Sequence, residues 1–228
     1  MFGVQDRLVA GSPITWSGAH LRPCLKVPGT RPTRRETLLN KVALRQQLRQ
    51  ARAAIDPKAA CNAAELAAQH LARTPWIRRA RHVAAYLDYG CELQTSPLIE
   101  YLLGSSKQIY IPRICANNRM RFFRLDERTP LRQNRYGITE PASSRPARSL
   151  RHMDVVILPL LGFDHHGTRL GSGGGYYDRA LAFPRVFRKP LLIGYGYACQ
   201  NVKSIPREAW DIRLDAVATE QGIFQFNR

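Results

Sequence analysis

The chain has 228 residues, and its 35 lysines and arginines outnumber its 17 aspartates and glutamates, which gives a formal charge of +18. Hydrophobic residues make up 44% and aromatic residues 9%, a content typical of a globular protein and too high for a disordered one. No apolar run approaches the roughly 18 residues of a membrane span, because the longest, residues 155–158, is ended by Pro159. A membrane protein, a collagen and a disulfide-stapled miniprotein are therefore excluded, and the charge favours a polyanionic ligand without selecting which.

The cysteines indicate reduced thiols in a cytoplasmic protein. They are odd in number, widely spaced and form no CxxC pair: Cys24, Cys61, Cys91, Cys115 and Cys199. No histidine lies at zinc-ligand spacing from any of them, so neither a zinc site nor a disulfide framework is expected. No secretory signal is visible in the first residues.

The chain divides into a tail and a domain. Residues 1–35 are punctuated by proline and glycine and carry no apolar period, so we expect a disordered N-terminal extension. An organelle transit peptide is an alternative, which the lack of an amphipathic pattern weakens. Residues 36–228 are expected to form a single α/β domain.

Helical periodicity begins near Glu36 and continues past residue 50. Its expected apolar face consists of Leu44, Leu48, Ala51 and Ile55. A second face repeats cations at nearly the same spacing: Lys41, Arg45, Arg49 and Arg52. Because like charges one turn apart repel by a few tenths of a kcal/mol, this stripe needs a reason. It is either a solvated surface or a phosphate clamp.

Further elements follow in chain order. Asp56 and Pro57 predict the N-cap and first turn of a second helix that ends near Arg73, and Ser96 can cap a helix over residues 97–103. Short apolar segments predict strands at residues 83–87, 108–112, 120–125, 155–160, 191–195 and 216–219, the last being the final strand. This alternation predicts a three-layer, Rossmann-like α/β fold with a mostly parallel sheet and helices on both faces. Ligands of such sheets bind at the carboxyl ends of the strands.

A glycine-rich loop after the strongest strand predicts a phosphate site. Its glycines allow the backbone to approach a ligand closely with N–H groups turned toward it: Gly171, Gly173, Gly174 and Gly175. The following helix start favours an anion, and Arg169 and Arg179 flank the loop. The loop is not a Walker A motif and is a poor dinucleotide fingerprint. Asp178 is well placed to hold Mg²⁺, or is an ordinary first-turn acid.

The segment 162–178, with its Gly-x-Gly-x-Gly-Tyr-Tyr-Asp run, resembles the 5-formyltetrahydrofolate cyclo-ligase family. The likeness extends from Lys41 to about Phe224, and the other family landmarks occur in order. They are Lys41 with Arg45, the segment 86–92 ending in Glu92, Ile111-Pro112-Arg113, Gly137 to Pro141, and Asp215. Six ordered matches at family-like spacing are very improbable by chance.

The resemblance implies an enzyme that uses ATP and Mg²⁺ to convert 5-formyltetrahydrofolate, with or without a polyglutamate tail, to 5,10-methenyltetrahydrofolate. In such enzymes ATP phosphorylates the formyl oxygen, nitrogen 10 closes the ring, and ADP and phosphate leave. The site must align that oxygen with the γ-phosphoryl group and neutralise the developing charge. The implied protein is cytoplasmic and monomeric, and it needs neither a membrane nor nucleic acid.

The resemblance also implies roles for individual residues. It assigns ATP binding to Lys41, Arg45, Arg169, Leu170, Gly171, Ser172, Gly173, Gly174, Gly175, Tyr176 and Tyr177. It assigns folate binding to Leu87, Glu92, Arg113, Tyr136 and Tyr176. It assigns Mg²⁺ to Asp178 and Asp215, and catalysis to Arg45, Glu92 and Tyr176.

Several of these positions have plainer interpretations. Leu87 and Tyr136 could be core residues, Arg113 could end a strand with a surface charge, and Asp215 could cap a turn. Arg49 and Arg52 are expected to be structural or solvated.

The glycine loop departs from the family at two positions. Ser172 and Gly174 stand where relatives often carry larger or basic side chains, so the cationic role would fall to Arg169, Lys41 and Arg45.

Two other functions stay open from the residues alone. One is a basic nucleic-acid-binding protein, whose affinity would fall steeply with salt and would not depend on Asp178. The other is an ATP-dependent ligase that acts on a different formyl or carboxyl substrate, for which Glu92 and Tyr136 would have no task.

Overall fold

The structure, a computed structural model, describes residues 34–115, 119–142, 147–183, 189–208 and 210–226. These residues belong to one compact unit. The expected extension lies outside the described residues, except for Arg34 and Arg35, which belong to the first helix.

The first two helices begin close to where the sequence predicts them. Helix α1 spans Arg34–Ala53 and α2 spans Pro57–Ala72, with the Asp56 carboxylate accepting hydrogen bonds from the N–H groups of Lys58 and Ala59. The apolar face expected for α1 is only partly correct. Leu48 is buried, but Ala51 is exposed and Ile55 lies beyond the end of the helix.

The remaining helices are short. They are α3 (Pro75–Arg79), α4 (Ser96–Leu103), α5 (Tyr176–Ala180), and the 3₁₀ turns η2 (Leu150–His152) and η4 (Ala198–Gln200). The capping prediction for Ser96 is wrong, because Thr95 occupies the N-cap and Ser96 is already helical. The Thr95 hydroxyl donates instead to Asp88, so it anchors the preceding loop.

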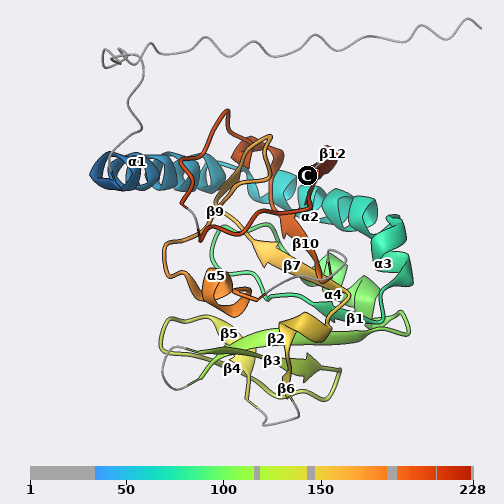
Figure 1. The fold of residues 1–228 in the computed structure, drawn as a ribbon. Coiled ribbons are helices and arrows are strands. Elements are labelled where there is room, and N and C mark those ends of the chain that lie inside the picture. Colours follow the sequence, from blue (N-terminus) through green and yellow to red (C-terminus); the bar gives the residue numbers. More distant parts are fainter. Residues whose placement is uncertain (1–33, 116–118, 143–146, 184–188, 209, 227–228) are drawn as a thin grey trace, which may run out of the picture. The chain divides into compact units, whose positions relative to one another are not determined.

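The strands of the main sheet are β1 (His82–Ala84), β2 (Gln108–Ile114), β3 (Met120–Leu125), β6 (Ala147–Arg148), β7 (Val155–Pro159), β10 (Leu191–Tyr195), β11 (Ala216–Thr219) and β12 (Gly222–Gln225). Their order across the sheet is β12-β11-β10-β7-β1-β2-β3-β6 (Figure 1). The central strands β11, β10, β7, β1 and β2 run parallel, whereas β12, β3 and β6 pair antiparallel at the two sides. The mostly parallel sheet is confirmed.

Two strand predictions are wrong. The first strand stops at Ala84 and not at residue 87, although the N–H of Ala85 still donates to the carbonyl of Tyr110 on β2, and β12 follows the segment expected to be last. Gly222, the first residue of β12, takes a φ of +130°, which lets the chain reverse within a short connection after β11. The prediction missed this hairpin.

The core covers both faces of the sheet. Along β1, Val83 packs into one cluster with the apolar faces of α2 and α4, and Ala84 packs into the other with Tyr177 and Leu181 near α5. Neighbouring strand residues point to opposite faces, so this alternation shows two covered faces. Figure 1 shows α2 and α5 on opposite sides of β7 and β10. The predicted α/β class with helices on both faces is confirmed.

None of the helices in the described part of the chain is long and apolar enough to cross a membrane. The cysteines of that part, Cys61, Cys91, Cys115 and Cys199, form no disulfide with one another.

Candidate active site

A cavity of about 1230 Å³ opens at the carboxyl ends of β7, β1 and β2, where the parallel sheet predicts a ligand. Its walls come from eight stretches of chain. They are α1, the loop after β1, the end of β2, the start of β3, the β4–β5 hairpin (Leu131–Gln133 and Thr139–Pro141), residues 159–161 after β7, residues 169–183, and residues 208 and 210–212.

The glycine loop lies on one side of this cavity. A short hairpin, β8 (Gly162–Phe163) and β9 (Arg169–Leu170), leads into it, and Gly175 ends it as the N-cap of α5 with a φ of +62°. The turn inside the hairpin is held by Asp164, whose carboxylate accepts hydrogen bonds from three backbone N–H groups and is buried. Because that turn is fixed, the loop leaves the sheet in a defined direction toward the cavity.

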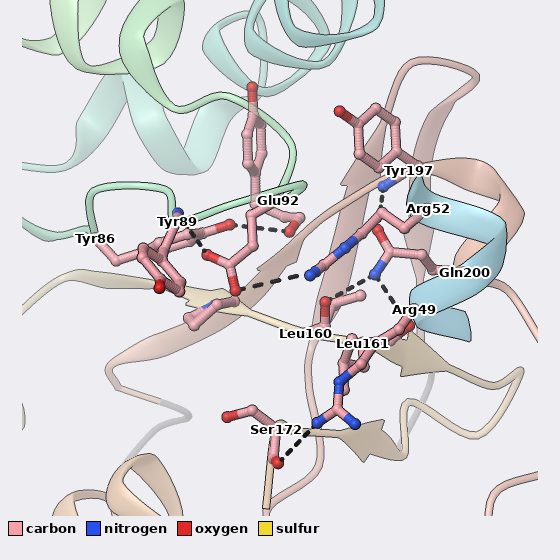
Figure 2. A network of polar contacts seen from close by, with 12 residues as sticks. Arg49, Arg52, Tyr86, Tyr89, Glu92, Leu160, Leu161, Ser172, Tyr197 and Gln200 are labelled. Atoms are coloured by element: carbon pink, nitrogen blue, oxygen red, sulfur yellow. Dashed lines mark hydrogen bonds and ion pairs between the residues drawn. The ribbon is translucent and has the colours of Figure 1, made fainter. Parts of the chain in front are cut away.

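Helix α1 faces the glycine loop with its cations. Arg45 donates through Nε to the carbonyl of Gly171 at 3.0 Å, and burial lowers its pKa. Lys41 is buried and pairs through Nζ with Asp211 Oδ2 at 2.7 Å. Arg49, which the sequence left structural or solvated, is exposed and reaches the carbonyl of Ser172 at 3.5 Å (Figure 2). The helix thus brings positive charge to the start of the loop.

Arg169 and Asp178 form an ion pair inside the loop. Arg169 Nη2 and Asp178 Oδ1 are 2.9 Å apart, and the arginine side chain is 6% exposed against 26% for the aspartate. A second N–H of Arg169 donates to the carbonyl of Pro159, the last residue of β7. The pair therefore fixes the first turn of α5 to the end of the central strand, with the carboxylate at the cavity wall.

Glu92 lies across the cavity, in the loop after β1. Its Oε2 accepts the backbone N–H of Tyr89 at 3.2 Å, and its Oε1 is 4.0 Å from Arg52 Nη1 at the end of α1 (Figure 2). Burial raises the pKa of Glu92, and the Arg52 charge opposes this shift. Of the two interpretations given for Arg52, structural or solvated, the solvated one is wrong, because its side chain is only 11% exposed.

Aromatic and apolar side chains complete this second side. Leu87, Tyr136 and Tyr176 line the cavity as the resemblance implies, and core packing is the wrong interpretation for Tyr136, which is 46% exposed. Sequence reasoning missed Tyr89 and Trp210, which also line the cavity and are exposed. Exposed aromatic rings around a cavity suit a flat ring ligand.

The β4–β5 hairpin presents Tyr136 by a local network. Asn134 Oδ1 accepts the N–H groups of Tyr136 and Ile138, and its Nδ2 donates to Glu140. Glu140 is buried and also pairs with Arg132. These bonds hold the tip of the hairpin in one conformation.

Two predicted site residues do not reach the cavity. Arg113 is on β2 between Pro112 and Ile114, and since those two line the cavity, Arg113 points to the opposite face, over the ring of Phe123 and toward the carbonyl of Pro141. The structure therefore does not place Arg113 in the cavity wall, and its contact with folate stays a prediction.

Asp215 is the second of these residues. It lies at the amino end of β11, and its Oδ2 accepts the N–H of Leu192 at 2.8 Å. Asp211, which precedes Asp215 by four residues, lines the cavity instead. In the described part of the chain, histidine, cysteine, aspartate and glutamate nowhere gather in a group of three suited to a metal. Asp178 lines the cavity at the carboxyl end of the sheet and Asp215 lies at the amino end of β11, so the structure does not bring the two acids together around one Mg²⁺ ion.

The model of the 5-formyltetrahydrofolate cyclo-ligase family matches residues 38–220. The chain belongs to this family. The cyclo-ligase of Escherichia coli K12 is 37% identical over 183 residues, which are 78% of this chain and 100% of the relative. That of Haemophilus influenzae is 32% identical over 75% of this chain and 92% of its own.

Solved structures agree with the family assignment. The 5,10-methenyltetrahydrofolate synthetase of Aquifex aeolicus superposes with a TM-score of 0.73 at 29% identity, covering 82% of this chain and 93% of the other. The synthetase of Mycoplasma pneumoniae, at 23% identity and a TM-score of 0.64, shares the fold over 79% of this chain and 99% of its own.

Proposed function

We propose that the protein converts 5-formyltetrahydrofolate to 5,10-methenyltetrahydrofolate at the expense of ATP, with Mg²⁺, and releases ADP and phosphate. The observation that carries the proposal is the composition of the single cavity described above. One side holds backbone N–H groups and cations suited to phosphates, and the other holds a carboxylate among aromatic rings. Membership of the family supports the folate as substrate.

The nucleotide would bind between α1 and the glycine loop. Lys41, Arg45 and Arg169 would neutralise the phosphates, and the backbone of residues 169–177 would donate hydrogen bonds to them. Ser172 and Gly174 carry no charge. Arg45, whose guanidinium carbon would be 3.8 Å from a Cβ at Gly173, is close enough to supply the missing cation.

The acids on this side suit a Mg²⁺ ion that is shared with a nucleotide, and not one held by protein ligands alone. Asp178 and Asp211 both line the cavity and both are paired, Asp178 with Arg169 and Asp211 with Lys41, but Asp178 is the more exposed of the two, at 26% against 16%. Since Mg²⁺ in such sites takes one or two carboxylates together with phosphates and water, Asp178 would hold it. When bound, the ion would neutralise charge on the phosphate oxygens.

The folate would bind against the opposite wall. Glu92, as a carboxylate, would accept hydrogen bonds from the N–H groups of the pterin. Leu87, Tyr136 and Tyr176 would contact the pterin and aminobenzoyl rings. Tyr176 directly follows the glycine loop and lines the same cavity, so in this proposal it would lie near the point where the formyl group and the γ-phosphoryl group meet.

The reaction itself needs activation of an amide oxygen, which is a weak nucleophile and a poor leaving group. The formyl oxygen attacks the γ-phosphoryl group and ADP departs. The lone pair of nitrogen 10 then attacks the formyl carbon, nitrogen 10 loses its proton, and the carbon–oxygen bond breaks to release phosphate. Arg45 would stabilise the negative charge that develops during both transfers, and Glu92 and Tyr176 would keep the folate aligned.

Three further properties belong to the same proposal. The protein would act in the cytoplasm as a monomer, would accept folates with polyglutamate tails, and would need neither a membrane nor nucleic acid.

The deciding experiment follows the near-ultraviolet absorbance of the methenyl product after 5-formyltetrahydrofolate, Mg²⁺ and ATP are mixed with the purified chain. An ATP-dependent rise is expected, and Asp178→Asn should remove it while circular dichroism shows an intact fold. Asp154→Asn makes the same change before β7, outside the cavity, and should retain the rise.

Other outcomes would contradict the proposal in different ways. A flat trace from a folded chain that still binds ATP would point to another acceptor. RNA binding that falls steeply with salt and ignores Asp178 would favour the nucleic-acid alternative.

A further inference from the structure

Arg52 is unusual for a cation at the C-terminal end of a helix because its side chain is largely buried. It lies in the last turn of α1, yet its side chain is 11% exposed, and α1 packs there against η4. Its Nε is buried without a hydrogen-bond partner among the described residues. A guanidinium so far from water is costly unless an anion compensates it. The carboxylate paired with it, at 4.0 Å, is Glu92 (Figure 2).

Glu92 is surrounded by groups of opposite effect. Burial raises its pKa, and the nearby Asp88 carboxylate raises it further. The Arg52 charge and the Tyr89 backbone N–H lower it. On the other sides stand the buried phenols of Tyr86 and Tyr177, whose own pKa values burial and the charge of Glu92 raise. The cation that acts on Glu92 is therefore Arg52.

We propose that Arg52 is a positioning residue that holds the Glu92 carboxylate, in its ionised form, against the folate end of the cavity. The inference rests on the proposed function, because it gives Glu92 the folate as its ligand. Arg52 does not line the cavity, so it acts through Glu92 and not on the substrate.

The same helix then serves both substrates. Lys41 and Arg45 face the nucleotide end, and Arg52, two to three turns further along, holds the group at the folate end. Because α1 is continuous from Arg34 to Ala53, the distance between these groups is set by the helix itself. A substitution at Arg52 should thus affect the folate and leave ATP binding intact.

The expected effects are specific. Arg52→Gln removes the charge, so Glu92 takes up a proton at higher pH and the affinity for 5-formyltetrahydrofolate begins to fall at higher pH than in the wild type. Near the pH where the wild type loses affinity, we expect roughly tenfold weaker binding, the scale of one partly buried ion pair. KM for folate should rise, with little change in KM for ATP. Arg52→Lys, which keeps the charge, should restore most of the affinity.

The test is a double-variant cycle read by calorimetric binding of 5-formyltetrahydrofolate without ATP or Mg²⁺, over a range of pH. The wild type, Arg52→Gln, Glu92→Gln and the double variant are compared. In the Glu92→Gln background, the substitution at Arg52 should have no effect. Arg49→Gln is the matched control: it removes the same charge from the same helix, but Arg49 contacts Ser172 and not Glu92.

Equal losses from Arg52→Gln in both backgrounds would overturn the inference, because they would show that the arginine only stabilises the fold. An unchanged pH profile in Arg52→Gln would overturn it as well. If Arg52→Gln does not fold, Arg52→Lys takes its place in the cycle, with a smaller loss that must also disappear beside Glu92→Gln. A wild type that does not bind the folate at all would overturn the proposed function and this inference with it, whereas the other results overturn this inference alone.

Discussion

The ion pair between Lys41 and Asp211 joins α1 to the segment before β11 and gives a quantitative test of the site's construction. The two charged atoms are 2.7 Å apart, and the side chains are 8% and 16% exposed. Removing either partner leaves the other charge largely out of water, which should cost about 3 kcal/mol of unfolding free energy. In the double variant Lys41→Met/Asp211→Asn no orphaned charge remains. Its loss should therefore be about 2 kcal/mol smaller than the sum of the single losses.

The assay is urea denaturation followed by circular dichroism, without nucleotide. A second cycle in the same protein provides the control, because Lys189 and Asp154 form an exposed pair. Their charged atoms are 3.5 Å apart, and the side chains are 69% and 31% exposed. Water screens such a pair, so the coupling between Lys189→Met and Asp154→Asn should stay below about 0.5 kcal/mol.

The comparison can fail in two ways. Equal coupling energies in the two cycles would mean that burial does not set the strength of the Lys41–Asp211 pair. A loss below about 1 kcal/mol in Lys41→Met would mean that the ammonium is not needed to compensate Asp211, contrary to the cost expected for a buried charge.

Three further predictions concern stability and pH. Asp56→Ala should lower the unfolding free energy, measured by thermal denaturation, by about 1 kcal/mol because it removes the N-cap of α2. Ser96→Ala, at a position that makes no cap, should change the unfolding free energy by less than about 0.5 kcal/mol. Gly194→Ala should lower the unfolding free energy, measured by urea denaturation, by roughly 2 kcal/mol, because a Cβ at this position would meet three buried aliphatic side chains. Burial raises the pKa of the Asp154 carboxyl, but hydrogen bonds from backbone N–H groups and the charge of a lysine outweigh burial, so the pKa is lowered overall. Asp154 therefore adds to the unfolding free energy above its pKa in the unfolded chain, and this contribution is lost as pH falls through its pKa in the folded protein. The difference in unfolding free energy between the wild type and Asp154→Asn should therefore shrink below about pH 4.

The sequence predicts the fold wherever a local pattern determines an element. The cap at Asp56 marks the start of α2, and the apolar segments at Met120–Leu125 and Leu191–Tyr195 coincide with β3 and β10. It fails where pairing with a distant strand decides the outcome. β12 exists because residues 222–225 pair with β11, and the segment alone has no strong alternation that shows it.

The candidate active site is likewise predictable where a local motif determines it. The glycine loop and Asp178 follow from their motif, and the structure places both at the cavity. Position along an element was harder to predict. Arg113 is next to a residue that lines the cavity but points away from it, because a strand alternates its faces. Of Asp211 and Asp215, only the first reaches the cavity, and the choice depends on where β11 begins.

The cation stripe on α1 shows why neither interpretation of the sequence was complete. Isolated, these side chains would repel one another and favour a solvated face. In the fold each has a partner outside the helix: Asp211 for Lys41, the adjacent carbonyls of residues 171 and 172 for Arg45 and Arg49, and Glu92 for Arg52. Because these acceptors lie in three separate parts of the chain, the sequence of the helix cannot show them. The repulsion among the four cations is offset only once the sheet has brought those parts of the chain together. The cation stripe therefore depends on the same tertiary fold that its contacts stabilise.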